Sequence, residues 1–109
     1  MREIYLGLNY LKFVILGAPF MPWIPARSAE KLVYGQAVKL ENGKKLRVES
    51  FKGDRWIEIT KKDNGFEILE HGFRNNILTV DEKELRRVLK ELLETEFPRS
   101  HQLRISVTS

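Results

Sequence analysis

The stretch from Asp81 to Phe97 constrains the fold of this chain more than any other segment. Its apolar residues recur three or four positions apart, and this spacing predicts a helix with one apolar stripe. Asp81 suits the N-cap position, Glu84 completes a capping box, and Pro98 cannot continue the helix. The stripe consists of Leu85, Val88, Leu89, Leu92, Leu93 and Phe97. Because a lone helix of this length is marginal in water, the stripe requires a partner surface.

An antiparallel sheet is predicted to supply that partner surface. Short runs of strand-forming residues alternate with turns that contain Gly or Asn. The predicted strands are Val33–Leu40, Lys44–Phe51, Asp54–Lys62, Gly65–His71 and a short Ile77–Thr79, with a final strand from Leu103 to Val107. We therefore expect an α+β fold, in which an antiparallel sheet of four or five strands packs one face against one long C-terminal helix.

The turns predict which strand residues face the helix. A two-residue turn at Lys52-Gly53 fixes the second hairpin, and a three-residue loop, Glu41–Gly43, is expected to close the first. The resulting core-facing pairs are Val48 with Ile57, Leu46 with Ile59, Val38 with Leu46, and Ile59 with Ile68, the last from pairing Lys61 with Phe66. All of these pairs share one face, which leaves the other face of the sheet free of the helix.

Trp56 is the unusual residue of that second, open face. It alternates with Ile57 and Ile59, so the largest side chain of the sheet lies on the polar side with Arg47 and His71. One interpretation is a stacking platform for unpaired bases, in which neighbouring cations attract the phosphate backbone. The other is a second small core, in which Trp56 packs under the apolar N-terminal segment.

Residues 1–29 form this apolar segment, which we separate from a single α+β domain at residues 30–109. Ile4–Phe20 is largely apolar, but Lys12 interrupts it, so we do not expect a membrane span. Prolines at every third position predict an extended chain over Pro19, Pro22 and Pro25. Three interpretations stay open: a secretory signal cleaved near Ala26–Ala29, an upstream extension from a misassigned start codon, and an arm that packs on its own domain or on a second subunit.

Composition narrows the classes of partner and compartment. The formal charge is +4 and the pI is near 9.5, which permits a polyanionic partner. The chain has no cysteine, so it has no disulfide, thiolate metal site or thiol nucleophile. This absence fits a reducing compartment, and we expect a cytoplasmic location. Abundant Lys, Arg and Glu with little Gln resembles the composition of hyperthermophile proteins.

Enzyme motifs are absent from the sequence. The two histidines, His71 and His101, belong to no HExxH motif, and neither a Gly-rich phosphate loop nor a nucleophile elbow occurs. A His71–Glu58 acid–base pair or a His71/His101 metal site would need further groups. The helix carboxylates are interpreted as a solvated exterior: Glu82, Glu84, Glu91, Glu94 and Glu96. We therefore expect no catalytic residue, no metal and no cofactor.

Three short motifs, in this order around the long helix, carry a resemblance to a known family. They are Gly53–Ile57 (GDRWI), Gly72–Asn75 (GFRN) and Glu96–His101 (EFPRSH), and together they resemble the archaeal ThermoDBP and ThermoDBP-related proteins over roughly Val33 to Val107. The resemblance implies single-stranded nucleic-acid binding by an apolar and aromatic cleft edged with basic residues, on a small sheet packed with helices. Family members with a C-terminal leucine zipper dimerise through it, but the sequence up to Ser109 has none, so we do not expect dimerisation by that route. A homodimer formed in another way stays an open alternative.

The expected function is therefore binding of single-stranded DNA or RNA with little sequence preference, at an aromatic and basic cleft on the open face. The residues expected to form the site are Trp56, Phe73, Phe51, Lys45, Arg47, Arg55, His71, Arg74, Arg99 and Arg104. The aromatic residues would stack bases and the cations would contact phosphates. Arg99 has a structural alternative, since a base just after a helix also neutralises the helix dipole. The alternative function is a protein-interaction module that buries the same face and the apolar arm against a partner subunit.

Overall fold

The computed structural model describes residues 23–108 of the chain. In chain order its elements are β1 (Trp23–Pro25), η1 (Ala26–Ser28), α2 (Ala29–Ala37), β2 (Lys45–Glu49), β3 (Trp56–Lys62), β4 (Gly65–His71), β5 (Asn75–Val80), α3 (Glu82–Glu96) and β6 (Gln102–Thr108). None of the helices in this range has the length and apolar run needed to cross a membrane.

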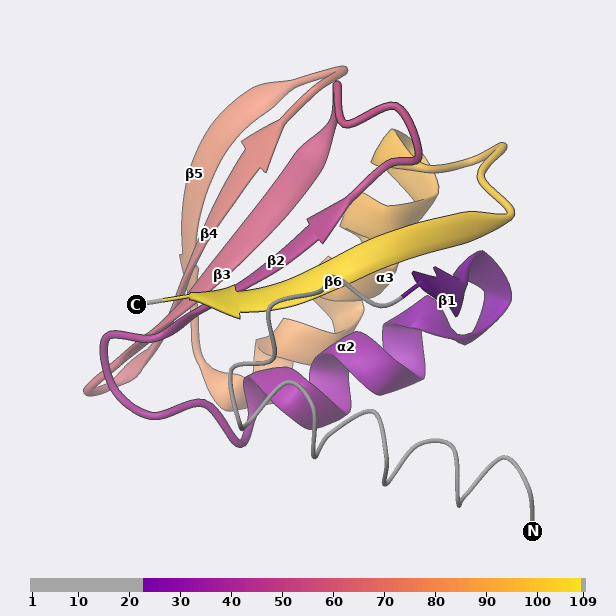
Figure 1. The fold of residues 1–109 in the computed structure, drawn as a ribbon. Coiled ribbons are helices and arrows are strands. Elements are labelled where there is room, and N and C mark those ends of the chain that lie inside the picture. The colour runs from indigo at the N-terminus through magenta and orange to yellow at the C-terminus, as the bar shows by residue number, and fades with distance from the viewer. Residues whose placement is uncertain (1–22, 109) are drawn as a thin grey trace, which may run out of the picture.

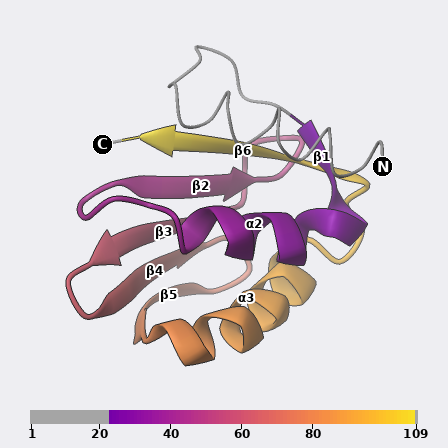
Figure 2. The ribbon, with the colours of Figure 1, turned by 90° about the horizontal axis from the view of Figure 1, so that it is seen from below.

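The strands form one antiparallel sheet in the order β1-β6-β2-β3-β4-β5, with α2 and α3 on one face (Figures 1 and 2). This confirms the α+β prediction. The expected sheet was too small, because the sheet is 6-stranded. The long helix is also not C-terminal: β6 follows it and pairs with β2 in the interior of the sheet, so the last strand of the chain is central to the fold.

The predicted strand Val33–Leu40 is wrong, because most of this segment belongs to α2. Ala29, Val33 and Ala37 are four residues apart and fully buried, which is the spacing of one helix face. Two further predictions depended on this strand and are therefore also wrong: the hairpin at Glu41–Gly43 and the pairing of Val38 with Leu46. The boundary drawn after residue 29 hid the helical period, since it separated Ala29, the first residue of α2, from Val33 and Ala37.

The other predicted strand pairings are confirmed. Leu46 lies opposite Ile59, Val48 opposite Ile57, and Ile59 opposite Ile68. These side chains are fully buried under the helices, so the predicted core face is the observed one. The turn at Lys52-Gly53 is the centre of a longer loop, which the backbone hydrogen bond from Ser50 N–H to the Arg55 carbonyl closes at 2.9 Å.

Helix α3 packs its predicted stripe into the core. Leu85, Leu89 and Leu92 are at most 2% exposed, and the remaining stripe residues Val88, Leu93 and Phe97 are also buried. The Asp81 side chain accepts a hydrogen bond from the Glu84 N–H at 2.9 Å, as expected of its N-cap. Glu96 departs from the prediction of a solvated carboxylate, because it is only 1% exposed.

The folded unit begins before residue 30. Trp23–Pro25 pairs with β6 at the edge of the sheet, and Ile24 is fully buried in the core. A truncation after residue 29 would therefore remove a strand and a core side chain. The rest of the expected arm, residues 1–22, lies outside the described residues, whereas the cleavage zone of the signal-peptide interpretation, Ala26–Ala29, falls in η1 and on the first residue of α2.

Candidate functional site

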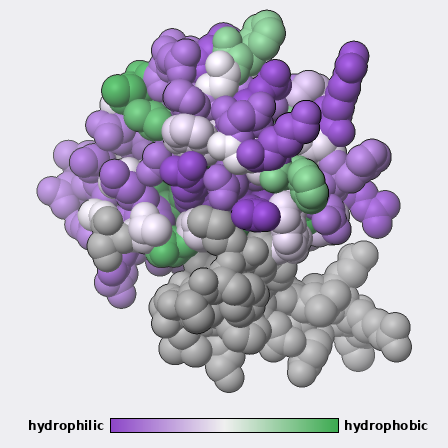
Figure 3. Space-filling model, turned by 45° about the horizontal axis from the view of Figure 1, so that its top comes forward, coloured by the Kyte–Doolittle hydropathy of each residue, from purple (hydrophilic) through white to green (hydrophobic). Residues whose placement is uncertain are grey.

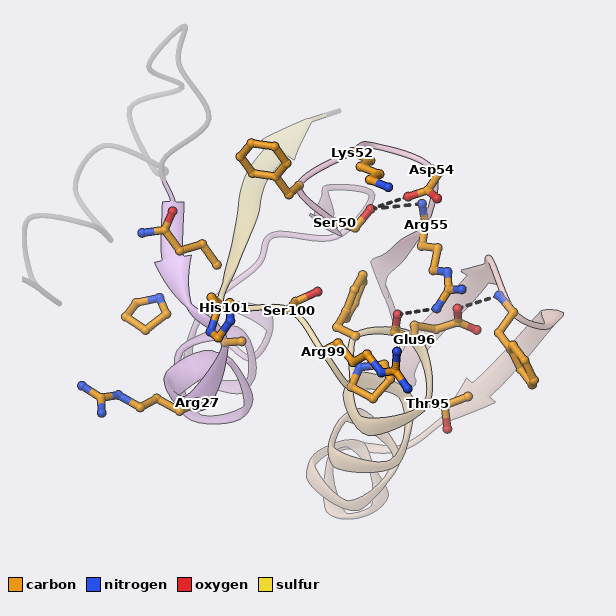
Figure 4. A pocket seen from close by; sticks show the side chains of 17 residues that line it. Arg27, Ser50, Lys52, Asp54, Arg55, Thr95, Glu96, Arg99, Ser100 and His101 are labelled. Atoms are coloured by element: carbon orange, nitrogen blue, oxygen red, sulfur yellow. Dashed lines mark hydrogen bonds between the residues drawn. The ribbon is translucent and has the colours of Figure 1, made fainter.

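A cleft lies at the end of the sheet where β6 begins (Figure 4). Its walls come from four places in the chain: the β1–η1 segment, the β2–β3 loop, the β4–β5 turn, and the end of α3 with the loop to β6. The volume of the cleft is about 1350 Å³, which is ample for several unstacked nucleotides or a short peptide. The cleft also gathers residues from all three family-like motifs, which are far apart in sequence.

Cationic side chains outnumber carboxylates in the lining of the cleft. Arg27, Lys52, Arg55 and Arg99 contribute positive charge, and Asp54 and Glu96 contribute negative charge. Among residues 23–108, Arg27, Lys52 and Arg99 take part in no ion pair, and all three are exposed. These three cations are therefore free to meet an anionic ligand.

The loop between β2 and β3, which carries Lys52 and Arg55, is held in one conformation by its own hydrogen bonds. Gly53 has a φ of +74°, a backbone region that favours glycine and allows the tight turn. The Ser50 hydroxyl donates to Asp54 at 2.9 Å, and the same oxygen accepts a 3.3 Å hydrogen bond from the Arg55 N–H. The hydrogen bond from Ser50 lowers the pKa of Asp54, so this carboxylate stays charged beside Lys52.

Two exposed phenylalanines flank the cations in the same cleft. Phe51 is 70% exposed on the β2–β3 loop, and Phe73 is 73% exposed on the β4–β5 turn. Phe97 also lines the cleft but is only 5% exposed, so it belongs mainly to the core. Two large rings that stay mostly exposed beside cations without ion pairs suit a ligand with flat apolar faces.

Glu96 connects two walls of the cleft, the β4–β5 turn and the β2–β3 loop, to the end of α3. Its carboxylate accepts hydrogen bonds from the backbone N–H of Phe73 at 2.7 Å and of Arg74 at 3.1 Å. Its own carbonyl oxygen accepts a 3.1 Å bond from Nη1 of Arg55. Gly72 makes the approach possible, because a Cβ there would collide with Oε1 of Glu96.

A second buried carboxyl group, Glu70, shares Arg74 with Glu96: Nε of Arg74 donates to Glu70 at 3.3 Å, and its backbone N–H donates to Glu96 at 3.1 Å. Burial and the hydrogen bond to Glu96 raise the pKa of Glu70, against the lowering effect of Asn76 and Arg74. Burial alone would raise the pKa of Glu96 as well, but the hydrogen bonds from Glu70 and from the N–H groups of Phe73 and Arg74 outweigh it and lower that pKa. Of the two carboxyl groups, Glu70 therefore holds its proton to a higher pH than Glu96 does.

The open face of the sheet carries a row of aromatic and charged side chains beside the cleft. Directly opposed residues across five neighbouring strands form the row: His71, Trp56, Glu49, Arg104 and Trp23. The rings of Trp56 and His71 stack with centroids 3.9 Å apart, and the Arg104 guanidinium lies 4.3 Å from the Trp23 ring centre. Phe51 lies 5.3 Å from Trp23, so it joins the row to the cleft.

The space-filling view shows a mostly polar surface on which apolar groups are small and separate (Figure 3).

The Arg47 side chain of the open face is already bound to other side chains. Its guanidinium lies 4.3 Å from the Trp56 ring centre and pairs with Glu49 at 3.3 Å and Glu58 at 3.8 Å. These contacts hold the Arg47 guanidinium against the Trp56 ring and two carboxylates, so it stabilises the ring stack more directly than it could bind a phosphate.

The predicted site residues thus fall into two adjoining groups. The cleft brings together Phe51, Arg55, Phe73 and Arg99, whereas Trp56, His71, Arg47 and Arg104 lie on the open face. Lys45 lies apart from both groups, because it is opposite Thr60 and Thr108 near the other end of β2. Arg74 lies next to Phe73, but its side chain pairs with Glu70 at 3.3 Å.

Sequence reasoning missed several residues of the cleft. Arg27 was assigned to the arm, Lys52 was treated only as a turn residue, and Glu96 was placed on the solvated side of the helix. His101 was part of a noted motif but was not proposed as a site residue. Nothing in local periodicity marks Lys52 or Arg27, because their position depends on long-range contacts of the loops.

No protein-family model, no curated protein and no solved structure matches this chain. The case for a function therefore rests on the geometry of the cleft and the open face.

Proposed function

We propose that this protein binds single-stranded DNA or RNA with little sequence preference, through the cleft and the adjoining row on the open face. One observation carries the proposal: two phenylalanines that are 70% and 73% exposed share a cleft with four cationic side chains. Exposed rings stack on any base, and cations without a protein partner take phosphates. The three motifs that resemble the ThermoDBP-related family all contribute to this cleft.

The open face supports the same ligand. Trp56 and His71 are already stacked, and Phe51 connects Trp23 to the cleft. Neighbouring strands are about 4.8 Å apart, so the row spans roughly 19 Å from β4 to β1. Such a row suits an extended strand of several nucleotides that continues from the cleft. Phe51 and Phe73 would stack bases, while Arg27, Lys52 and Arg99 would contact phosphates.

Fluorescence titration tests the proposal. Trp23 and Trp56, the two tryptophans of the chain, both lie on the open face. Titration with oligo-dT and oligo-U at low and high salt should quench their emission, with an apparent affinity that falls as salt increases. The comparison of the two oligonucleotides also tests preference for RNA, which would require contacts to the 2′-hydroxyl. Absence of quenching together with absence of binding by a labelled oligonucleotide would refute the proposal.

A protein-interaction module is the second candidate, and one observation favours it. Ile77 is 67% exposed on β5, which is an edge strand of the sheet, and Phe73 is exposed on the turn that leads into this strand. An apolar residue on a free edge suits a protein partner that adds a strand. Analytical ultracentrifugation distinguishes the candidates: concentration-dependent association that Ile77→Arg abolishes favours the module, and a monomer that binds oligonucleotide favours the cleft.

A further inference from the structure

The buried carboxyl pair under the cleft links three segments that carry binding groups. We propose that Glu70 and Glu96 are positioning residues, which share one proton and thereby hold the β4–β5 turn with Phe73 in place, so that loss of this proton weakens binding of single-stranded nucleic acid. The inference rests on the proposed function and concerns the pH regulation of the same site.

Glu96 is the point at which the segments meet. A single side chain, 1% exposed, accepts the N–H of Phe73 and of Arg74 at 2.7 Å and 3.1 Å. The backbone of the same residue holds the Arg55 guanidinium at 3.1 Å. The last turn of α3 thus sets the place of one stacking ring and one cation, and a shift of this carboxylate moves the β4–β5 turn.

Glu70 fixes the other side of the pair. It is 2% exposed, and it accepts hydrogen bonds from Nδ2 of Asn76 at 3.2 Å and Nε of Arg74 at 3.3 Å. The groups that face the pair are therefore Arg74 from the β4–β5 turn, Arg55 from the β2–β3 loop, and the neutral Asn76 from β5. Arg74 offsets part of the charge but does not replace the proton between the two carboxyl groups.

The contact between Glu70 and Glu96 requires a proton, because two carboxylates only accept hydrogen bonds. With the proton on Glu70, its hydroxyl donates to the charged Glu96, which also receives the two backbone N–H groups. Removal of the proton leaves two like charges in a buried site, and these repel strongly. The pair then separates, and the turn that carries Phe73 loses its support.

The pKa shifts of Glu70 and Glu96 have opposite directions, and together they determine how binding depends on pH. The pKa of Glu70 is raised in the folded protein. Its contribution to the stability of the folded site is therefore complete at low pH and is lost as the pH rises through that pKa. The pKa of Glu96 is lowered, so its contribution is complete above the pKa of an unfolded glutamate and is lost as the pH falls through the folded value. Binding should be strongest between these two limits.

Two isosteric variants separate the roles of the pair. Glu70→Gln presents an amide N–H to Glu96 at every pH, so its affinity should lack the decline on the alkaline side. Glu96→Gln places an NH₂ group against one of the two backbone N–H donors, so one of those bonds is lost. Its binding should be weaker by about tenfold at every pH, which is the effect of one lost hydrogen bond to a charged group.

The experiment combines amide NMR of the free protein with oligo-dT binding, across about pH 4–9. In the wild type the amide resonances of Phe73 and Arg74 should shift on the alkaline limb while affinity falls by about tenfold. In Glu70→Gln neither change should occur, and histidine effects cancel because both proteins keep His71 and His101. Thermal melts of each protein identify any loss of affinity that comes from unfolding.

Amides that do not titrate in the wild type, or that titrate equally in Glu70→Gln, would overturn the inference. Amides that titrate while affinity stays constant would also overturn it, because the pair would then not position the site. Amides that titrate in a protein that binds no oligonucleotide would refute the proposed function, and would leave the proton-sharing pair supported as part of the fold alone. If Glu96→Gln does not fold, the comparison with Glu70→Gln still decides.

Discussion

Replacement of Phe73 by alanine gives the sharpest separation of ligand binding from folding. Because Phe73 is 73% exposed, its removal uncovers little buried surface, and stability should change by less than about 0.5 kcal/mol. The alanine keeps the backbone N–H that Glu96 accepts, so the turn stays in place. A base that stacks on the ring would lose about 1–3 kcal/mol, or roughly 5- to 150-fold in Kd.

Ile77→Ala is the matched control for this change. Ile77 is a similarly exposed apolar residue at 67%, and it lies on the next strand but does not line the cleft. It should keep an affinity within about twofold of the wild type. Fluorescence anisotropy of labelled oligo-dT measures the affinities, and urea melts measure the stabilities. Equal losses of affinity in both variants, or none in Phe73→Ala, would refute stacking in the cleft.

Three other changes test the fold around the site. Leu89→Ala removes a fully buried side chain of α3 and should lower the free energy of unfolding by about 2–5 kcal/mol in urea melts; a change below about 0.5 kcal/mol would contradict the packing. Ile24→Ala should cost about as much if β1 belongs to the core, whereas a negligible loss would make this strand dispensable. Gly72→Ala places a Cβ against Glu96 and 2.9 Å from Cγ of Arg55, so it should destabilise by about 1–3 kcal/mol and weaken oligonucleotide binding; wild-type values of both would contradict the role of Glu96.

Strong local patterns made parts of the fold predictable. The helix at Asp81–Phe97 combines an N-cap, a long apolar stripe and a terminating proline, and α3 appears within one residue of those limits. The pairings from Leu46 to Ile68 follow from two-residue alternation and from turns that contain glycine. Local sequence and tertiary packing agree in these segments, so the prediction needed no knowledge of distant contacts.

The failures come from segments in which local pattern and tertiary context differ. The Val33–Leu40 run contains β-branched and aromatic residues, yet its burial follows Ala29, Val33 and Ala37 on one helix face. Small alanines give a weak apolar signal, although they allow α2 to pack closely against the rest of the core. Glu96 continues the helical pattern of a solvated face, and only the β4–β5 turn that packs on it makes it buried.

The candidate site was partly predictable for the same reason. Alternation along the strands placed Trp56, Arg47 and His71 together on the open face, and the structure has the same arrangement. The cleft itself depends on four loops and ends that meet in space, and no strand register describes them. The motif with Phe97 and Arg99 pointed to part of the cleft, whereas Arg27 and Lys52 needed the structure.

The salt dependence of oligonucleotide affinity tests the central claim most directly. Log K for oligo-dT should fall linearly with log salt, because cations of the cleft release counterions from the phosphates they contact. Arg99→Ala should reduce the magnitude of this slope by about 0.7, the value for one phosphate of a single strand. Arg87→Ala is the matched control, since Arg87 is an exposed arginine of α3 that does not line the cleft, and it should leave the slope unchanged. A wild-type affinity that does not depend on salt, or equal slopes for all three proteins, would contradict phosphate binding in the cleft.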